Sequence, residues 1–226
     1  MVKSDKSWWP GQADYDWIES TGRPPHPVFL EMEEAASGIK SIPILSRDSG
    51  RVLAVLAANR RRIIEFGTAI GYSTLWMALG MPPDGRITTI DPDASRTGRA
   101  REFWQRAAVP DDRIEVITAP ALDAFGGADA SLAGPFDMVF IDALKEEYQG
   151  YLDAVRGRLT PGALVVADNV LWSGRTSGGR PSSPGDGTQE LRDFCARLSA
   201  DPAFETAILP IGDGLLVAAL RADAGA

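Results

Sequence analysis

The sequence predicts an α/β fold with a seven-stranded, mostly parallel sheet and helices on both faces. From residue 62 onward, short runs rich in β-branched residues alternate with longer stretches of helical periodicity. This alternation is typical of parallel strands that are joined by right-handed helical crossovers. The last two strand patterns are separated only by residues 210–214, which is too short for a crossover. We therefore expect an antiparallel hairpin at the C-terminal end of the sheet.

Each element is assigned from its own run of residues. The strands are expected at residues 62–66, 86–90, 114–118, 137–141, 163–167, 204–209 and 215–220. Helices are expected near residues 72–79, 95–107, 146–158 and 189–200, and residues 121–125 are assigned either to a short helix or to a loop. A further helix precedes the first strand, because Ser46 can cap it and Val52, Leu53, Val55 and Leu56 form an apolar stripe.

The chain is expected to divide at about residue 40. Residues 1–40 are assigned to an N-terminal arm and helix, and residues 41–226 to the main domain. The first 30 residues hold four prolines and three tryptophans without a clear period, so the arm is expected to lie on the domain or on a partner subunit. Residues 173–187 are rich in Gly, Ser and Pro and are expected to form a mobile loop rather than a domain linker.

The composition argues against several classes of function. The chain has 226 residues, 44% of them apolar, and its 23 basic and 31 acidic residues give a formal net charge of −8. Such a surface disfavours nucleic acid and anionic membranes as partners, and the one tight basic cluster, at residues 60–62, is interpreted as a solvated turn before a strand. The apolar runs are too short to cross a bilayer and the N-terminus has no leader pattern, so we expect a cytoplasmic protein.

The scarcity of cysteine and histidine narrows the chemistry further. Cys195 lies in an amphipathic helical pattern that favours a packing role, and a single cysteine permits no internal disulfide and no multi-cysteine zinc site. His26 stands among prolines, without the partners of a nucleophilic triad. Catalysis centred on a thiol or an imidazole is therefore not expected.

A glycine-containing turn follows the first predicted strand. Gly67 and Gly71 lie between that strand and the next helix, where glycines allow backbone N–H groups to approach a ligand, although they can also serve the turn alone. The spacing is not G-x-G-x-x-G, and the strand ends with the acid Glu65. A carboxylate there disfavours a phosphate ligand and favours one that has a positive end and hydroxyl groups.

The second strand ends on an acid that suits a nucleoside. Asp91 follows Gly71 by twenty residues, at the position from which a carboxylate accepts hydrogen bonds from ribose hydroxyls. Ala119, Pro120 and Ala121 follow the third strand and could form a wall for a flat base. The alternative for this segment is a structural cap by Pro120.

Oxygen-bearing side chains follow the fourth and fifth strands. Asp142 ends the fourth, and Asp168 with Asn169 ends the fifth, so these side chains are expected to converge at the carboxyl edge of the sheet. Carboxylate and amide oxygens suit Mg²⁺, with Ca²⁺ or Mn²⁺ as alternatives, and are poor ligands for zinc. The competing interpretation is that Asp142 caps a helix and that Asp168 and Asn169 form a turn.

A lysine lies close to this cluster in the sequence. Lys145 follows Asp142 by three residues, at or near the start of the next predicted helix. A divalent cation beside it would disfavour the ammonium form, so Lys145 could act as a general base. Without the cation it would be an ordinary solvated lysine.

Five ordered motifs resemble the cation-dependent class I S-adenosylmethionine O-methyltransferases, the group that contains catechol and caffeoyl-CoA O-methyltransferases. They are E-F-G-T-A-I-G-Y-S at residues 65–73, I-D at 90–91, F-I-D-A-L-K-E-E-Y at 140–148, V-A-D-N-V-L-W-S-G at 166–174 and L-P-I-G-D-G at 209–214. The resemblance runs from about residue 40 to residue 221. It implies a Rossmann-like fold with S-adenosylmethionine as cofactor, and a divalent cation, Mg²⁺ before Ca²⁺ or Mn²⁺.

The resemblance also implies roles for individual residues. The expected cofactor-binding residues are Glu65, Gly67, Gly71, Tyr72, Ser73, Asp91, Ala119, Pro120, Ala121 and Asp142. The implied metal ligands are Asp142, Asp168 and Asn169, and the implied catalytic residues are Lys145, as the base, and Asp142. The cation would bind two vicinal oxygens of a small phenolic acceptor, one of which attacks the sulfonium methyl group directly. Relatives are commonly homodimers, so a homodimer is expected.

The chain also departs from the family's pattern. Leu144 replaces a second acid of plant relatives, residues 42–50 match poorly, and the N-terminal arm has no counterpart. Trp172 is assigned either to an aromatic wall for the acceptor or to packing, and coenzyme A esters are alternative acceptors if Arg175 and Arg180 line the entrance. Two other functions stay open: a nucleotide-dependent oxidoreductase, which the missing G-x-G-x-x-G turn disfavours, and an inactive protein that binds S-adenosylmethionine.

Overall fold

The protein contains one seven-stranded sheet with helices on both faces, as predicted. The structure is a computed structural model, and it describes residues 10–38, 42–127 and 129–222. Its strands are β1 (Arg62–Phe66), β2 (Arg86–Ile90), β3 (Ile114–Ile117), β4 (Phe136–Ile141), β5 (Leu159–Ala167), β6 (Phe204–Leu209) and β7 (Leu215–Leu220). They lie in the order β3-β2-β1-β4-β5-β7-β6.

The C-terminal hairpin is confirmed. β6 and β7 are antiparallel, and β7 inserts between β6 and β5, with which it is also antiparallel. The five strands β3, β2, β1, β4 and β5 are parallel. β5 begins four residues earlier than predicted, because its first part contains Pro161 and Gly162, is largely exposed and pairs with β4 across a register shift. A strand segment of this kind has no apolar signal.

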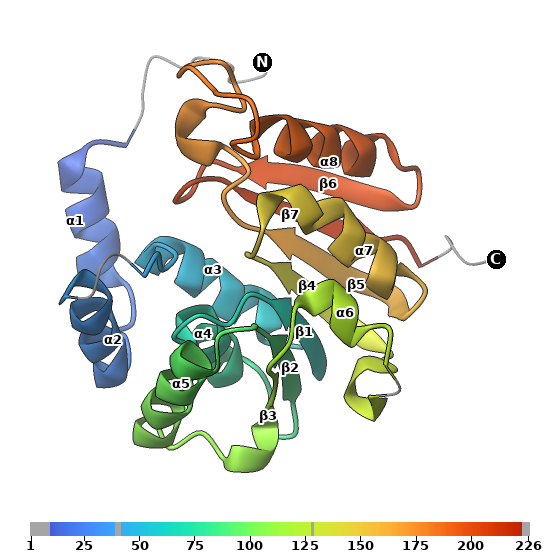
Figure 1. The fold of residues 1–226 in the computed structure, drawn as a ribbon. Coiled ribbons are helices and arrows are strands. Elements are labelled where there is room, and N and C mark those ends of the chain that lie inside the picture. Colours follow the sequence, from blue (N-terminus) through green and yellow to red (C-terminus); the bar gives the residue numbers. More distant parts are fainter. Residues whose placement is uncertain (1–9, 39–41, 128, 223–226) are drawn as a thin grey trace.

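Helices cover the two faces of the sheet (Figure 1), and a hydrophobic cluster lies on each side of it. α3 (Arg47–Ala57), α4 (Tyr72–Gly80) and α5 (Ala94–Arg106) cover one face, and α6 (Ala121–Ala124), α7 (Tyr148–Arg156) and α8 (Thr188–Ala200) the other. Short 3-10 helices occur at Asp111–Arg113, Ala130–Leu132, Lys145–Glu147 and Trp172–Gly174. α7 begins two residues later than expected because its predicted first turn is the 3-10 helix Lys145–Glu147.

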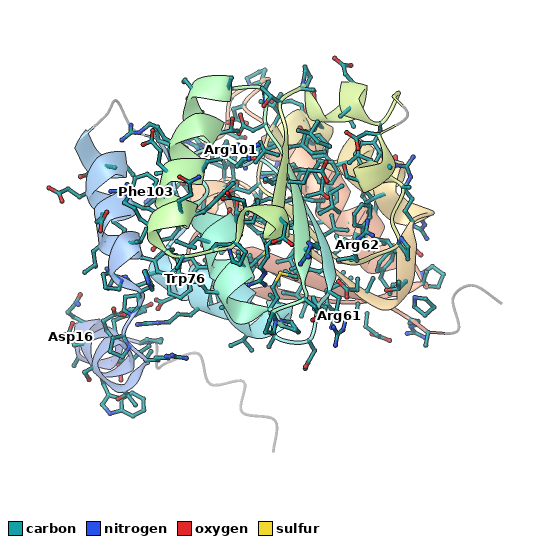
Figure 2. The ribbon with its side chains drawn as sticks, turned by 90° about the horizontal axis from the view of Figure 1, so that it is seen from below. Asp16, Arg61, Arg62, Trp76, Arg101 and Phe103 are labelled. Atoms are coloured by element: carbon teal, nitrogen blue, oxygen red, sulfur yellow. The ribbon has the colours of Figure 1, made fainter. Side chains whose placement is uncertain are left out.

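Two N-terminal helices precede α3, α1 (Gln12–Thr21) and α2 (Pro27–Gly38). α2 is the helix expected before residue 40, and it buries Phe29 and Met32 in the same cluster as the main domain, where Phe29 stacks on Trp76 with 4.0 Å between ring centroids. Where the arm was expected, residues 12–21 are helical. α1 gave no periodic signal because none of its side chains is buried. In Figure 2, Trp76 and Phe103 lie toward these helices, and Asp16 lies at the outer edge.

Other predictions from composition can be compared with the fold. In the basic cluster, Arg60 and Arg61 precede β1 and Arg62 is its first residue. Arg60 donates to the carbonyl oxygens of Asp137 and Gly162, and Arg61 pairs with Asp84. Cys195 is half-buried on α8, and burial raises the pKa of its thiol to about 11, which is consistent with packing. Within the described ranges no helix has both the length and the apolarity that crossing a membrane requires.

A buried acid joins β1 to the start of α4. The side chain of Glu65 is inaccessible to solvent, and its two carboxylate oxygens accept hydrogen bonds of 2.5 Å from the hydroxyls of Ser73 and Thr74. Burial raises the pKa of Glu65 from 4.5 to about 7, although both hydrogen bonds favour the carboxylate. The contact fixes the first turn of α4 against the end of the strand.

This burial makes stability depend on pH in the absence of a cofactor. Between pH 4.5 and 7 the unfolded chain releases the Glu65 proton while the folded protein retains it, so the free energy of unfolding falls as the pH rises. Gln at position 65 stays neutral. Glu65→Gln should therefore gain up to about 3 kcal/mol over the wild type above pH 7. In calorimetry this is a rise in Tm of several degrees at pH 8 that shrinks at pH 5.

The exposed Glu115 on β3 offers a matched control. Glu115→Gln should leave Tm nearly unchanged at both pH values, because a surface substitution alters stability by less than about 0.5 kcal/mol. If Glu65→Gln instead lowered Tm equally at pH 5 and pH 8, the carboxylate would be a net stabilising group and the prediction would be wrong.

Candidate active site

Four neighbouring strands end in register and place the predicted site residues in one row. Phe66 pairs with Ile90 of β2 and Ile141 of β4, and Ile141 pairs with Ala167 of β5. The next residue along each of the four strands is Gly67, Asp91, Asp142 or Asp168. The strand order reverses between β1 and β4, the position where open α/β sheets bind ligands.

The glycines of the turn after β1 are required by protein neighbours. Gly67 has φ +96°, and a Cβ added there would lie 2.1 Å from the carbonyl oxygen of Asp142. Gly71 has φ +78°, and a Cβ added there would lie 2.5 Å from the indole of Trp104, whose Nε1 donates to the Gly71 carbonyl. The sequence pattern indicates the close approach of a ligand at these glycines. In the structure they also allow close contact between the ends of β1 and β4 and between α4 and α5.

The first turn of α4 presents backbone groups rather than side chains. Gly71 is the N-cap and has no side chain, so the N–H groups of Tyr72 and Ser73 have no helical acceptor. The Tyr72 hydroxyl donates to Glu33 on α2, and the Ser73 hydroxyl donates to Glu65. A helix N-terminus of this kind favours an anionic group of a ligand. Direct binding of a cofactor by the carboxylate of Glu65 is not supported, because that carboxylate is buried and already hydrogen-bonded.

Asp91 holds the turn as well as the end of β2. One of its oxygens accepts from the N–H of Ala69 at 2.8 Å and the other from the N–H of Asp93 at 2.9 Å. The bond to Ala69 fixes a non-glycine residue with φ +45° in the turn. Each carboxylate oxygen has a second lone pair, so the ribose role expected from the sequence remains chemically available.

The segment after β3 begins the short helix α6. Pro120 is the N-cap of α6, as the structural alternative supposed, and Ala121, the first residue of the helix, is buried. Ala119 is half-buried at the carboxyl end of β3. The three residues therefore lie at the same edge as Asp91, while Ala121 mainly serves packing.

Asp142, Asp168, Asn169 and Lys145 form one cluster. The Lys145 ammonium donates to an oxygen of Asp142 at 3.1 Å and to the amide oxygen of Asn169 at 2.6 Å. The Asn169 amide nitrogen in turn donates to Asp168 at 3.1 Å. The capping alternative for Asp142 is wrong, because the N-cap of the following 3-10 helix is Leu144. Asn169 does form a turn, with φ +61°, but its side chain is part of the cluster.

The second oxygen of Asp168 identifies where a cation would fit. Asp168 Oδ1 is buried and accepts no hydrogen bond from the described residues. Burial raises the pKa of Asp168 to about 7, and the charge of Asp142 acts in the same direction. Three or more Asp, Glu, His or Cys side chains do not gather at any metal-sized site in the described ranges, so the candidate ligands are two carboxylates and one amide. A divalent cation would satisfy Oδ1 and offset the repulsion between the carboxylates.

Sequence reasoning missed one residue of this cluster. Tyr148 is fully buried, accepts from Lys145 at 2.7 Å and donates to the carbonyl oxygen of Asp168 at 3.1 Å. Burial raises the pKa of its phenol well above the usual value, so the hydroxyl stays neutral. Its spacing of three residues from Lys145 was the available signal, because both residues then lie on one side of a helical turn.

Trp172 satisfies parts of both assignments. The centre of its ring lies 5.5 Å from Lys145 Nζ, which places Trp172 beside the site residues. The same side chain packs against the hydrophobic cluster on the side of the sheet that α7 and α8 cover. Trp172 and Ser173 have φ of +48° and +55°, and Ser173 N–H donates to Asp213 at 2.5 Å. The 173–187 segment is a loop as predicted, and it is hydrogen-bonded to its neighbours: Trp172 Nε1 donates to the Asp186 carbonyl, and Arg192 donates to the carbonyls of Arg175 and Thr176.

Known proteins are similar to this chain in sequence and fold. Residues 25–221 match the model of the O-methyltransferase family. A catechol O-methyltransferase of Niastella koreensis is 35% identical over 177 residues, which cover 77% of this chain and 78% of the relative. A caffeoyl-CoA O-methyltransferase of Eucalyptus gunnii is 31% identical over 220 residues, which cover 93% and 88%.

A solved structure agrees with the fold as well as the sequence. The O-methyltransferase TomG of Streptomyces achromogenes, crystallised in complex with S-adenosylmethionine, superposes with a TM-score of 0.80 at 29% identity and covers 91% of this chain and 95% of its own. The family match spans the strand ends, the glycine turn and the acidic cluster described above. The chain therefore belongs to the family of S-adenosylmethionine-dependent O-methyltransferases.

Proposed function

We propose that this protein methylates one hydroxyl of a small phenol that carries two vicinal oxygens, with a divalent cation held by Asp142, Asp168 and Asn169. The observation that carries the proposal is the buried, unpartnered Oδ1 of Asp168 beside Lys145, at the same edge as the glycine turn. The names of the relatives, catechol and caffeoyl-CoA O-methyltransferases, support an ortho-dioxygenated ring as the acceptor. The family match excludes the oxidoreductase alternative.

The cofactor would be held mainly by backbone groups and one acid. The uncapped N–H groups of Tyr72 and Ser73 suit the carboxylate of the methionine portion, and Asp91 suits the ribose hydroxyls. S-adenosylmethionine supplies an electrophilic methyl group on a sulfonium. Gly67 keeps this turn against the carbonyl of Asp142, so the methyl donor and the acidic cluster share one edge of the sheet.

A divalent cation at the acidic cluster would bind the acceptor's oxygens and lower the pKa of the hydroxyl that reacts. Asp142, Asp168 and Asn169 would hold it through hard oxygen ligands, for which Mg²⁺ fits best and Ca²⁺ or Mn²⁺ are alternatives. Asp168 is fixed for this role by the bond of Tyr148 to its carbonyl oxygen.

Lys145 is the group that would receive the acceptor's proton. The Lys145 side chain is 10% exposed, and its Nζ donates to three acceptors, on Asp142, Tyr148 and Asn169. If the oxygens of Asp142 and Asn169 turn to a cation, the ammonium loses two acceptors and faces a positive charge, which favours the neutral amine. The acceptor hydroxyl then transfers its proton to Nζ. A lone pair of the resulting oxyanion forms the bond to the methyl carbon, and the electrons of the broken S–C bond remain on sulfur as the thioether.

The proposal is tested directly by methyl transfer. Purified protein with labelled S-adenosylmethionine and Mg²⁺ should methylate catechol-type acceptors but not phenols with a single hydroxyl. EDTA should abolish turnover, and added Mg²⁺ should restore it. Comparison with caffeoyl-CoA separates a free small phenol from a coenzyme A ester. Labelled methyl transfer that is equally fast in EDTA would contradict the cation role.

Metal binding is predicted to depend on Asp168. Asp168→Asn removes the charge that faces the cation, so the Kd for Mn²⁺ measured by calorimetry should rise by at least about tenfold. Glu147→Gln is the matched control, because Glu147 lies on the same 3-10 helix as Lys145 but its carboxylate accepts from Tyr151, away from the cluster. Equal Mn²⁺ affinity in wild type and Asp168→Asn would show that the cluster is not the metal site.

Lys145 is predicted to act by proton transfer rather than by charge alone. Lys145→Met should lower kcat by about 10²- to 10⁴-fold. Lys145→Arg keeps the positive charge and hydrogen-bond donors but cannot be deprotonated, so it should be nearly as slow. Affinity for S-adenosylhomocysteine should stay within about twofold in both variants. If Lys145→Arg restored turnover, Lys145 would be a structural cation and not the base.

A further inference from the structure

Tyr72 connects the cofactor turn to the N-terminal helices. It is the first residue of α4 and follows Gly71 directly, yet its side chain is only 3% exposed and packs edge-on against Phe29 of α2, with 5.3 Å between ring centroids. Its hydroxyl donates to Oε1 of Glu33 on α2 at 2.6 Å. The side chain therefore belongs to the α2–α4 contact, while the backbone belongs to the turn.

Glu33 is held in place from α3. Arg47, the first residue of α3, donates from Nε to Oε1 of Glu33 at 3.1 Å and from Nη2 to Oε2 at 2.6 Å. Burial raises the pKa of Glu33, but the hydrogen bonds from Arg47 and Tyr72 outweigh it and hold the pKa below its usual value. At neutral pH a carboxylate thus bridges α2, α3 and α4, and a two-point pair with Arg47 fixes its orientation.

The same arginine extends the contact to α1. Arg47 and Arg51 both donate to the carboxylate of Glu19, the latter at 2.5 Å. No residue of α1 is fully buried in the described structure, and these ion pairs attach the helix to α3. Glu19, Arg47, Glu33 and Tyr72 form a continuous ionic chain from α1 to the residue next to Gly71.

This chain reaches the turn at Tyr72, the residue that follows the uncapped Gly71. Gly71 is a left-handed N-cap without a capping side chain, and its backbone is held by the Trp104 indole on the α5 side. The next residue, Tyr72, is held through its hydroxyl by Glu33 of α2. Phe29 and Met32 of α2 are buried in the core, and the hydrogen bond from Tyr72 to Glu33 adds a directional contact to this packing. Backbone N–H groups bind a ligand well only when their orientation is set beforehand.

We propose that Glu33 is a positioning residue for the cofactor turn, acting through Tyr72, and that the ionic chain Glu19–Arg47–Glu33–Tyr72 couples α1 and α2 to cofactor binding. The inference rests on the proposed placing of the cofactor at the turn that contains Tyr72. Coupling between two sites is reciprocal. The chain therefore orients the turn, and a bound cofactor stabilises the attachment of α1 and α2.

The test measures S-adenosylhomocysteine binding by calorimetry on the full chain, without metal or acceptor. Glu33→Gln and Tyr72→Phe should each raise the Kd about tenfold, which corresponds to about 1.4 kcal/mol. The double variant should be no weaker than either single variant, because both remove the same contact. Cofactor-bound wild type should also show slower amide exchange over residues 12–21 and 27–38 than the free protein, and Glu33→Gln should lose most of that protection.

Glu31→Gln supplies the matched control. Glu31 lies on the same helix and pairs with Arg106 of α5 at 2.7 Å, on the outside of α2 and away from Tyr72. Its loss removes one ion pair of α2 without touching the turn, so the Kd should stay within about twofold of wild type. If Glu33→Gln fails to fold, Tyr72→Phe still tests the contact.

The outcomes separate this inference from the proposed function. The positioning role is overturned if wild type binds S-adenosylhomocysteine and the Kd values of Glu33→Gln and Tyr72→Phe are no higher than that of Glu31→Gln. It is also overturned if the losses of binding free energy in the two single variants add up in the double variant. A lower Tm with unchanged Kd and unchanged exchange would likewise reduce Glu33 to a structural ion pair. Wild-type protein that binds no S-adenosylhomocysteine would overturn the cofactor site itself, and the positioning role with it.

Discussion

The close approach of the turn after β1 to the end of β4 is the constraint on which the site depends. The carbonyl oxygen of Asp142 occupies the space that a side chain at position 67 would need, so only glycine fits there. Because the four strands end in register, this contact places the turn beside Asp142 and one strand away from Asp168. A methyl donor bound at the turn and a phenol bound at the acidic cluster would thus meet without any movement of domains.

Two buried acids at this edge, Glu65 and Asp168, are destabilised in their charged form by burial to a similar degree, but they differ in their hydrogen-bond partners. Burial raises the pKa of both Glu65 and Asp168 to about 7. Both oxygens of Glu65 accept hydroxyl hydrogen bonds, so Glu65 is a structural brace for α4. Asp168 keeps one oxygen without a partner in the described structure, next to a second carboxylate and a lysine. That difference, rather than the number of acids, distinguishes the candidate cation site from the scaffold.

The N-terminal helices give the turn a support that the sheet does not provide. α2 is docked by apolar burial, whereas α1 is attached by the two arginines that pair with Glu19. Ionic attachment is weaker than apolar burial and is more easily changed by a ligand or a partner. A chain of ion pairs that ends in the hydrogen bond of Tyr72 to Glu33 therefore links α1 to the residues that would hold the cofactor.

The sequence by itself determined the features that depend on neighbouring residues. Strand and helix periodicity, the short hairpin connection, the turn of Gly67 and Gly71 and the acids at strand ends are local patterns, and the sheet register brings those acids together as expected. Only the tertiary structure decided which groups face a ligand. It placed the side chains of Glu65, Tyr72 and Ser73 in contacts with the scaffold. Those outcomes depend on contacts such as Tyr72 with Glu33, 39 residues apart, and a periodicity that is read over one or two helical turns contains no information at that distance.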